Sequence, residues 1–92
     1  MDLNIYTIWD QKADAYLNPF FLPNDALALR TFKDCTNDEN HAFGKNPDDY
    51  TLFNLGSFNT NTGKFDLHST PKSLGNGLIV RGATAKGLPH SE

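Results

Sequence analysis

The chain has 92 residues, a formal net charge of −3 and a single cysteine, Cys35. This length holds one domain near the lower size limit for an independent core, and one cysteine excludes an internal disulfide framework and favours a reducing compartment. With 38% hydrophobic and 12% aromatic residues, the composition is too aromatic for a disordered chain and too interrupted by polar residues for a membrane protein.

Residues 3–9 alternate their side chains between two faces, which predicts a first strand. The same N-terminal segment has no basic region followed by a continuous apolar run, so we expect no signal peptide. After a short polar link, residues 15–22 predict a second strand antiparallel to the first. Pro19 cannot donate to a ladder, so we expect an edge strand or a bulge there. An exposed edge can recruit another chain.

Residues 23–38 predict the one long helix of the chain. Asn24 is the expected N-cap, and Asp25 in the first turn suits the positive end of the helix dipole. Leu27 falls away from the apolar side, and we interpret it as an exposed leucine or, alternatively, as a subunit contact. The stripe that we expect to face the sheet consists of Ala28, Leu29, Phe32 and Cys35.

Residues 37–50 contain Gly, Pro, Asn and Asp at a density typical of a loop with one helical turn at most. A hairpin follows, with its loop over residues 59–63 and Gly63 free to take a positive φ. Pairing Ser57 with Phe65 points Asn54 outward. The same register places one set of apolar side chains on the face that we expect to be core: Phe53, Leu55, Phe65 and Leu67.

Residues 69–77 predict a loop, residues 78–80 a short last strand, and residues 81–92 a flexible C-terminal tail. The element order is β-β-α-β-β, with the short last strand as an addition. We therefore expect the α+β class, in which a small antiparallel sheet carries one packed helix, and a single domain over residues 1–80.

Motifs for catalysis and for metal binding are missing from the sequence. Cys35, His41, His68 and His90 lack the spacing of a zinc site. The "GNG" at residues 75–77 lacks the Lys-Ser/Thr and the following helix of a phosphate loop, and no nucleophile elbow or Cys–His pair can be assembled. We expect a protein that is not an enzyme, has no cofactor or metal, and does not bind a membrane.

Three segments carry a resemblance to a known family: "KADAYLNPFF" at 12–21, "NPDDYTLFNLGSFNTNTGKF" at 46–65 and "TPKSLG" at 70–75. With an "IYTIWD" opening and a helix ending in "RTFKD", they resemble the small non-structural protein of gokushoviruses, single-stranded DNA phages of the microvirus family. The likeness covers residues 3–80. It implies a phage protein outside the mature capsid that acts in the host cytoplasm, in genome replication or in the switch to single-strand synthesis and packaging.

Two functions remain open. Residues 1–49 carry a net charge of −5 and residues 50–92 a net charge of +2, and a basic track beside aromatic rings is typical of proteins that bind single-stranded nucleic acid. The candidates for that role are Phe58, Lys64, Lys72 and Arg81. The interpretation without a binding role is that Phe58 belongs to the core and that the few basic side chains are simply solvated. The overall charge of −3 also opposes tight electrostatic binding.

The alternative is an interaction module that binds a phage or host replication protein without contacting DNA. The acidic first half, the edge near Pro19 and the outward Leu27 would serve this role. Edge pairing between two copies would also produce a homo-oligomer.

Overall fold

The computed structural model describes residues 1–85, with side chains as far as residue 82. One antiparallel sheet contains five strands: β1 (Asp2–Asp10), β2 (Ala15–Tyr16), β3 (Phe20–Leu22), β4 (Tyr50–Asn59) and β5 (Phe65–Asn76). The helices are α1 (Asp25–Thr36), α2 (Ala42–Lys45), α3 (Gly77–Ala85) and the short 3₁₀ helix η1 (Pro47–Asp49). The expected α+β class is confirmed.

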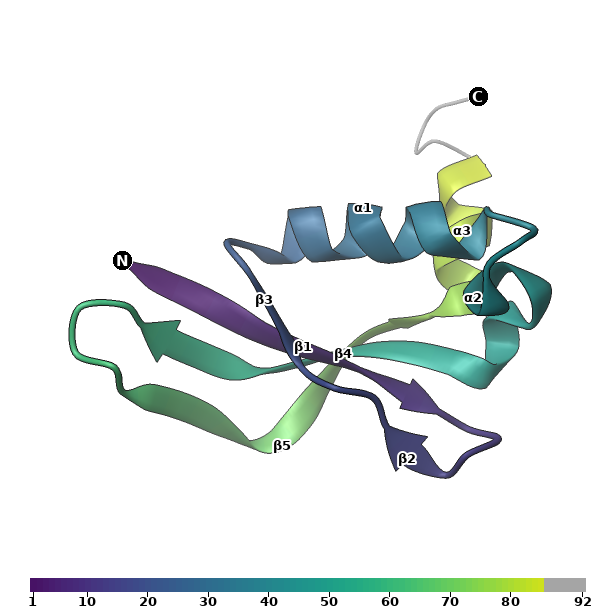
Figure 1. The fold of residues 1–92 in the computed structure, drawn as a ribbon. Helices are drawn as coiled ribbons and strands as arrows, with labels where there is room; N and C mark the ends of the chain where they lie inside the picture. Colours follow the sequence, from purple (N-terminus) through teal and green to yellow (C-terminus); the bar gives the residue numbers. More distant parts are fainter. Residues whose placement is uncertain (86–92) are drawn as a thin grey trace.

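The sheet has one covered and one uncovered face. Its strand order is β2-β1-β4-β5, and β3 also pairs with β1. Figure 1 shows α1 and α3 above the sheet and, within residues 1–85, no helix below it. We call the side under α1 the covered face and the opposite side the uncovered face.

The core lies between α1 and the covered face. It consists of Tyr6, Ile8, Ala28, Phe32 and Leu52, which are all nearly inaccessible to solvent. The helix begins as expected, because the side chain of Asn24 accepts a hydrogen bond from the backbone N–H of Leu27 at 2.8 Å. Its predicted apolar stripe is confirmed, with Leu29 packed on the core and Cys35 half-buried. Leu27, expected to be exposed, is half-buried.

The second predicted strand forms two short pieces, β2 and β3, on either side of Pro19. Both pairs with β1 are antiparallel, and both pieces lie on the edge of β1 that β4 does not occupy. The edge position expected from Pro19 is therefore confirmed. The loop expected after α1 contains α2 and η1, and α2 is capped by His41, whose Nδ1 accepts from the backbone N–H of Phe43 at 3.0 Å.

The predicted hairpin register is wrong by one residue. The structure pairs Phe58 with Phe65 and Ser57 with Asp66, whereas the sequence pattern pairs Ser57 with Phe65. The loop itself is where the sequence predicts it, since the N–H of Asn59 donates to the carbonyl of Lys64 at 2.9 Å and Gly63 has φ +73°.

The predicted core face of the hairpin is also wrong. Phe65 and Leu67 are 57% and 60% exposed, and Phe53 and Leu55 are only half-buried. The buried β4 side chains are Leu52, with no exposed area, and Asn54.

The predicted core face is wrong because β4 contains a β-bulge and because one of its polar side chains is buried with its hydrogen bonds made. In the pairing with β1, Ile5 faces Gly56 and Tyr6 faces Asn54, so Leu55 is an extra residue in β4. Asn54 tolerates burial because its side-chain amide is hydrogen-bonded on both ends.

The C-terminal part differs from the sequence prediction. The expected loop at 69–77 is instead the continuation of β5, which accepts Pro71 because it is an edge strand. The expected strand at 78–80 is helical, since the Asn76 side chain accepts a hydrogen bond from the N–H of Leu78 at 3.1 Å and thereby caps α3. Residues 81–85 belong to α3, and the remainder of the expected tail, 86–92, lies outside the described residues.

Candidate nucleic-acid interface

Aromatic rings gather on the uncovered face of the sheet. The Phe58 ring lies 5.0 Å from that of Phe65 and 5.9 Å from that of Phe21, between ring centroids. A second group joins Tyr16 to Trp9 at 4.8 Å and to Phe53 at 5.8 Å. These residues alternate along the strands with core residues such as Tyr6, Ile8 and Leu52, so they point to the opposite side. We call this set the aromatic surface: Trp9, Tyr16, Phe21, Phe53, Phe58 and Phe65.

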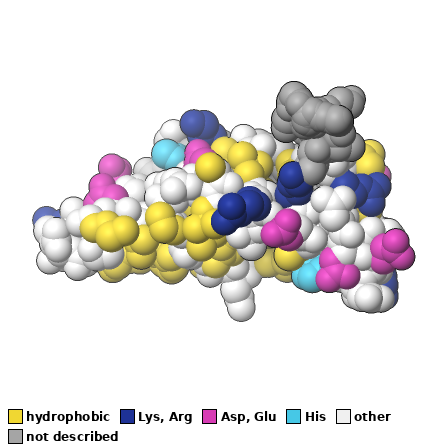
Figure 2. Space-filling model, turned by 90° about the horizontal axis from the view of Figure 1, so that it is seen from above, with side chains coloured by type: hydrophobic (Ala, Val, Ile, Leu, Met, Phe, Trp, Pro, Cys, Tyr) yellow, Lys and Arg dark blue, Asp and Glu magenta, His cyan; other side chains and the backbone are white. Residues whose placement is uncertain are grey.

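The aromatic surface is open to solvent and rests on a packed layer. Tyr16 and Phe21 are 49% and 42% exposed, in addition to Phe65. Two β1 residues on the same side, Ile5 and Thr7, are buried, so the rings do not stand alone. Figure 2 views the molecule from above, on the side of α1 and α3, and shows hydrophobic side chains from the narrow end to the middle and many charged groups at the broad end. The aromatic surface lies on the side away from that view, and contiguous exposed apolar groups such as its rings mark binding surfaces.

The four residues expected to bind nucleic acid occupy different places. Phe58 belongs to the aromatic surface, and Lys64 is exposed in the hairpin loop directly before Phe65. Lys72 pairs with Asn54 and lies on the covered face, and Arg81 lies in α3. The structure therefore brings Phe58 and Lys64 together at one end of the sheet, away from the other two.

Sequence reasoning missed Phe21 and Phe65 as surface residues. Their signal was the excess of aromatic residues over what a small core can hold, because seven Phe, three Tyr and one Trp occur in 92 residues. Only two of those rings, Tyr6 and Phe32, are fully buried in the core cluster.

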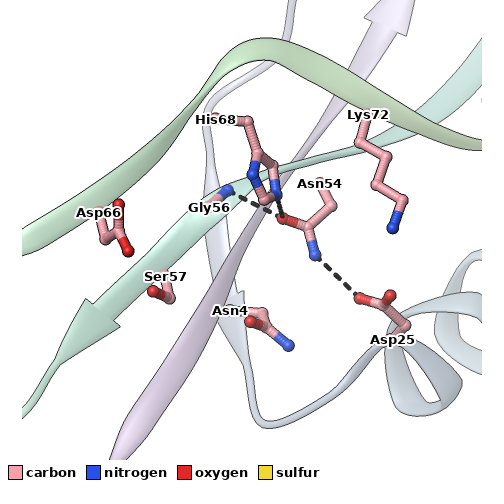
Figure 3. Close-up of a pocket in the computed structure, with 8 residues that line it drawn as sticks. All are labelled: Asn4, Asp25, Asn54, Gly56, Ser57, Asp66, His68 and Lys72. Atoms are coloured by element: carbon pink, nitrogen blue, oxygen red, sulfur yellow. Dashed lines mark hydrogen bonds between the residues drawn. The ribbon is translucent and has the colours of Figure 1, made fainter.

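A polar network lies on the covered face, between β4 and the start of α1 (Figure 3). The Tyr6 hydroxyl donates to Asp25 Oδ1 at 2.7 Å, and Asn54 Nδ2 donates to the same oxygen at 2.9 Å. Asn54 Oδ1 accepts from the N–H of Gly56 at 2.8 Å and lies 3.1 Å from His68 Nε2. Burial, followed by the bond to Asp25, raises the pKa of Tyr6 to about 12. The network ties α1 to the bulged part of β4.

This network is the floor of a polar pocket of about 260 Å³. The pocket mixes cationic, anionic and neutral groups rather than presenting one sign of charge, and it lies on the opposite side of the sheet from the aromatic surface. Its lining side chains include Asn4, Asp25, Asn54, Ser57, Asp66, His68 and Lys72.

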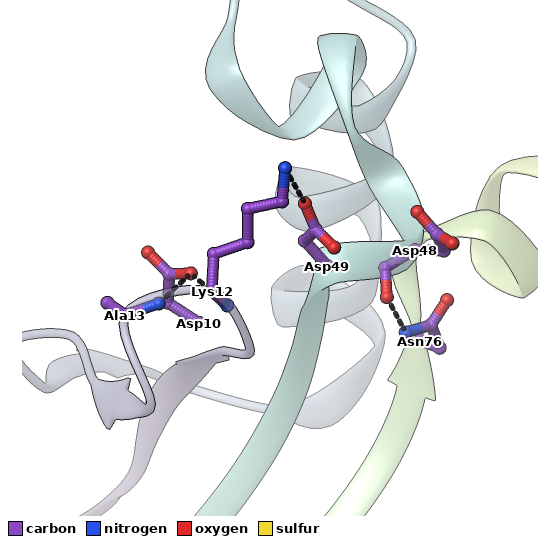
Figure 4. A network of polar contacts seen from close by, with 6 residues as sticks. All are labelled: Asp10, Lys12, Ala13, Asp48, Asp49 and Asn76. Atoms are coloured by element: carbon purple, nitrogen blue, oxygen red, sulfur yellow. Dashed lines mark hydrogen bonds and ion pairs between the residues drawn. The ribbon is translucent and has the colours of Figure 1, made fainter.

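A second polar network joins the loops at the broad end of the molecule (Figure 4). Lys12 Nζ lies 4.0 Å from Asp49 Oδ2, and Asp10 Oδ1 accepts from the N–H groups of Lys12 and Ala13. Asn76 Nδ2 donates to the Asp48 carbonyl at 3.0 Å, which connects η1 to the end of β5. Lys12 thus has a carboxylate partner, whereas Lys64 has none among the described residues.

Within residues 1–85, no three His, Cys, Asp or Glu side chains lie together in a way that could hold a metal ion. Cys35 is a free thiol, and burial, followed by the charges of Asp34 and Asp38, raises its pKa. The described helices include none with the length and apolar character needed to cross a membrane.

The fold and the aromatic surface define a small α+β domain whose antiparallel sheet is covered on one face and carries aromatic rings on the other. A family model described as "Phage ORF5 protein" matches residues 3–80. The chain therefore belongs to the Phage ORF5 protein family and is a phage protein. No curated protein and no solved structure matches it.

Proposed function

We propose that this phage protein binds single-stranded DNA through the aromatic surface. The observation that carries the proposal is the contact cluster of Phe21, Phe58 and Phe65 on a sheet face that no helix covers within residues 1–85. Every base has a π-face, so exposed rings stack bases with little sequence preference, at about 1–3 kcal/mol for each base. Sheets with helices on one face and aromatic residues on the other stack two or three bases in RNA-binding domains, and this analogy supports the same use here.

Lys64 supports the proposal because it places a positive charge at the same end of the sheet as Phe58 and Phe65. It directly precedes Phe65, it is exposed, and it has no ion pair among the described residues. Lys64 lines a shallow pocket together with Phe65, Asp2 and Asp66, and it forms no ion pair with either carboxylate. A phosphate beside the bases stacked on Phe58 and Phe65 would meet Lys64 first. The net charge of −3 makes this a moderate, salt-dependent affinity rather than a tight one.

The biological role that fits is that of a non-enzymatic, non-structural accessory protein of a gokushovirus-type microvirus. It acts in the host cytoplasm, during genome replication or the switch to single-strand synthesis and packaging. Two things support this role: membership of the Phage ORF5 protein family and the resemblance of the segments at 12–21, 46–65 and 70–75.

The test is a titration of the full chain with a single-stranded oligonucleotide, with duplex as competitor, at several salt concentrations. Trp9 contacts Tyr16 in the aromatic surface, so its fluorescence reports stacking there. We expect binding that weakens with salt and resists duplex, and Lys64→Ala should lower the salt slope by about 0.7, the value for one phosphate contact on a single strand. Lys45→Ala, an exposed lysine on α2, is the matched control and should leave the slope unchanged. Lack of single-strand binding at low salt would contradict the proposal.

A second candidate is a module that binds a phage or host replication protein without DNA. The observation that favours it is the uncharged character of the aromatic surface together with Leu78 and Ile79 of α3, which are 48% and 68% exposed. A protein partner would bury these apolar groups without any need for phosphate contacts. Absence of DNA binding at low salt, combined with capture of a replication protein that Phe65→Ala abolishes, would favour this candidate.

A further inference from the structure

β5 is the long open edge of the sheet. The opposite edge consists of the two short strands β2 and β3, which Pro19 separates. β5 spans 12 residues, and its first six residues, 65–70, are all exposed. A strand at a sheet edge presents unpaired N–H and C=O groups, which pair readily with another strand.

The side chains of β5 are complementary to a second copy of β5. Asp66 and Lys72 both line the pocket of the covered face, and Figure 3 shows them on either side of His68. Neither side chain forms an ion pair within the described residues, where Lys12–Asp49 is the ion pair found. They lie three residues before and three residues after Ser69, so a two-fold axis at Ser69 would place each beside the opposite charge. Residues 68–71 between them have no paired residue on β4, because the register of β5 shifts there, and a second copy of β5 would supply the pairing that they lack.

We propose that two copies of the chain pair antiparallel through β5, with Ser69 facing Ser69 and Asp66 of each copy facing Lys72 of the other. The side chains meet on the same side, because Asp66 and Lys72 pair with Ser57 and Asn54 of β4 and both lie on the covered face. Opposite charges directly across a strand pair stabilise it, and they also fix its register.

This dimer forms one continuous sheet and aligns the two aromatic surfaces on one side. In the dimer, Phe65 of each copy lies opposite Ser73 of the other copy. Because Ser73 also pairs with Phe53 of its own chain, it lies between Phe53 of one copy and Phe65 of the other. Pro71 has no N–H, so the pair of Leu67 with Pro71 holds a single hydrogen bond. Because exposed ion pairs add little stability, the dimer is reversible and depends on concentration. It does not rest on DNA binding.

The experiment is sedimentation of the full chain without DNA over micromolar to millimolar concentrations. The wild type should self-associate, and Asp66→Lys or Lys72→Asp alone should weaken association roughly tenfold, because each puts like charges opposite one another twice. The double variant Asp66→Lys/Lys72→Asp should recover the wild-type constant. Asp34→Lys on α1 and Lys45→Asp on α2 make the same charge changes at exposed sites away from β5 and should have no effect. A monomeric wild type, unaffected single variants or a double variant that stays weak would overturn the proposal.

A cross-link tests the register independently. Ser69→Cys in a Cys35→Ser background should form a disulfide-linked dimer under mild oxidation, since residues facing each other across antiparallel strands lie within disulfide distance. Thr62→Cys in the exposed hairpin loop is the control and should not cross-link. Equal cross-linking of both variants, or none for Ser69→Cys, would contradict the register. A failure of single-strand binding would leave all of these results unchanged.

Discussion

The two faces of the sheet carry similar side chains and differ in what lies over them. On the covered face, Leu52 and Tyr6 have no exposed area because α1 packs on them. On the uncovered face, Phe65 and Leu67 are more than half exposed, although they are equally apolar. Alternation along a strand therefore shows which side chains share a face, while the position of the helix decides which face becomes the core. The exposed apolar face is the one available for binding.

The largest expected effect contrasts two leucines on neighbouring strands. Leu52→Ala should lower the free energy of unfolding by about 2–5 kcal/mol, because it removes a fully buried side chain and leaves a cavity. Leu67→Ala should cost less than about 1 kcal/mol, since Leu67 is 60% exposed. Urea unfolding of both variants provides the measurement. Equal losses would mean that the two faces do not differ as the structure describes.

The next effect is a loss of stability at alkaline pH that comes from the covered face. The folded-state pKa of Tyr6, about 12, lies above its ordinary value of 10.0, so the folded protein holds this proton more tightly than the unfolded chain does. The resulting stability is fully present below pH 10 and disappears as the pH rises toward 12. For two pKa units it amounts to at most about 2–3 kcal/mol.

Unfolding curves between pH 9 and 12 measure this effect. Tyr6→Phe should flatten the alkaline decline while it lowers stability at neutral pH, because it also removes the hydrogen bond to Asp25. Tyr16→Phe, a half-exposed tyrosine of the aromatic surface, is the control and should keep the wild-type slope. An unchanged decline in Tyr6→Phe would assign the alkaline sensitivity to another group, such as Tyr50, whose pKa burial also raises.

A smaller effect is expected at Asn54. Asn54→Ala should cost about 1–3 kcal/mol, because it leaves the buried N–H of Gly56 without its acceptor and releases Asp25 from β4. Asn61→Ala in the exposed hairpin loop should change stability by less than about 0.5 kcal/mol. Thermal unfolding distinguishes the two variants, and a silent Asn54→Ala would show that the polar network does not hold α1 to the sheet.

The parts of the fold that the sequence predicts correctly are those with strong local signals. The polar cap Asn24, followed by an apolar stripe at helical spacing, predicts α1 from one end to the other. The alternation of residues 3–9 predicts β1, and Pro19 predicts the edge position of the strand pieces around it. Each of these signals depends on neighbouring residues only.

The errors occur where distant residues decide the structure. The bulge at Leu55 becomes visible only in the pairing of β4 with β1, and Asn54 is buried because Asp25, 29 residues earlier, accepts its hydrogen bond. Asn76 caps a helix where the glycines on either side of it suggest a loop. The candidate interface is predicted only in part: Phe58 and Lys64 lie together, but Phe21 joins Phe58 through strand pairings that alternation alone does not show.

The contrast between two exposed apolar residues tests the central claim most directly. Phe65 of the aromatic surface and Ile79 of α3 are 57% and 68% exposed, so replacing either by Ala should have little effect on folding. Single-strand DNA affinity should fall by about 1–3 kcal/mol in Phe65→Ala, at an unchanged salt slope, because the ring stacks a base but contacts no phosphate. Ile79→Ala should bind as the wild type does. Equal affinities for both variants and the wild type would contradict the assignment of the aromatic surface as the DNA-binding site.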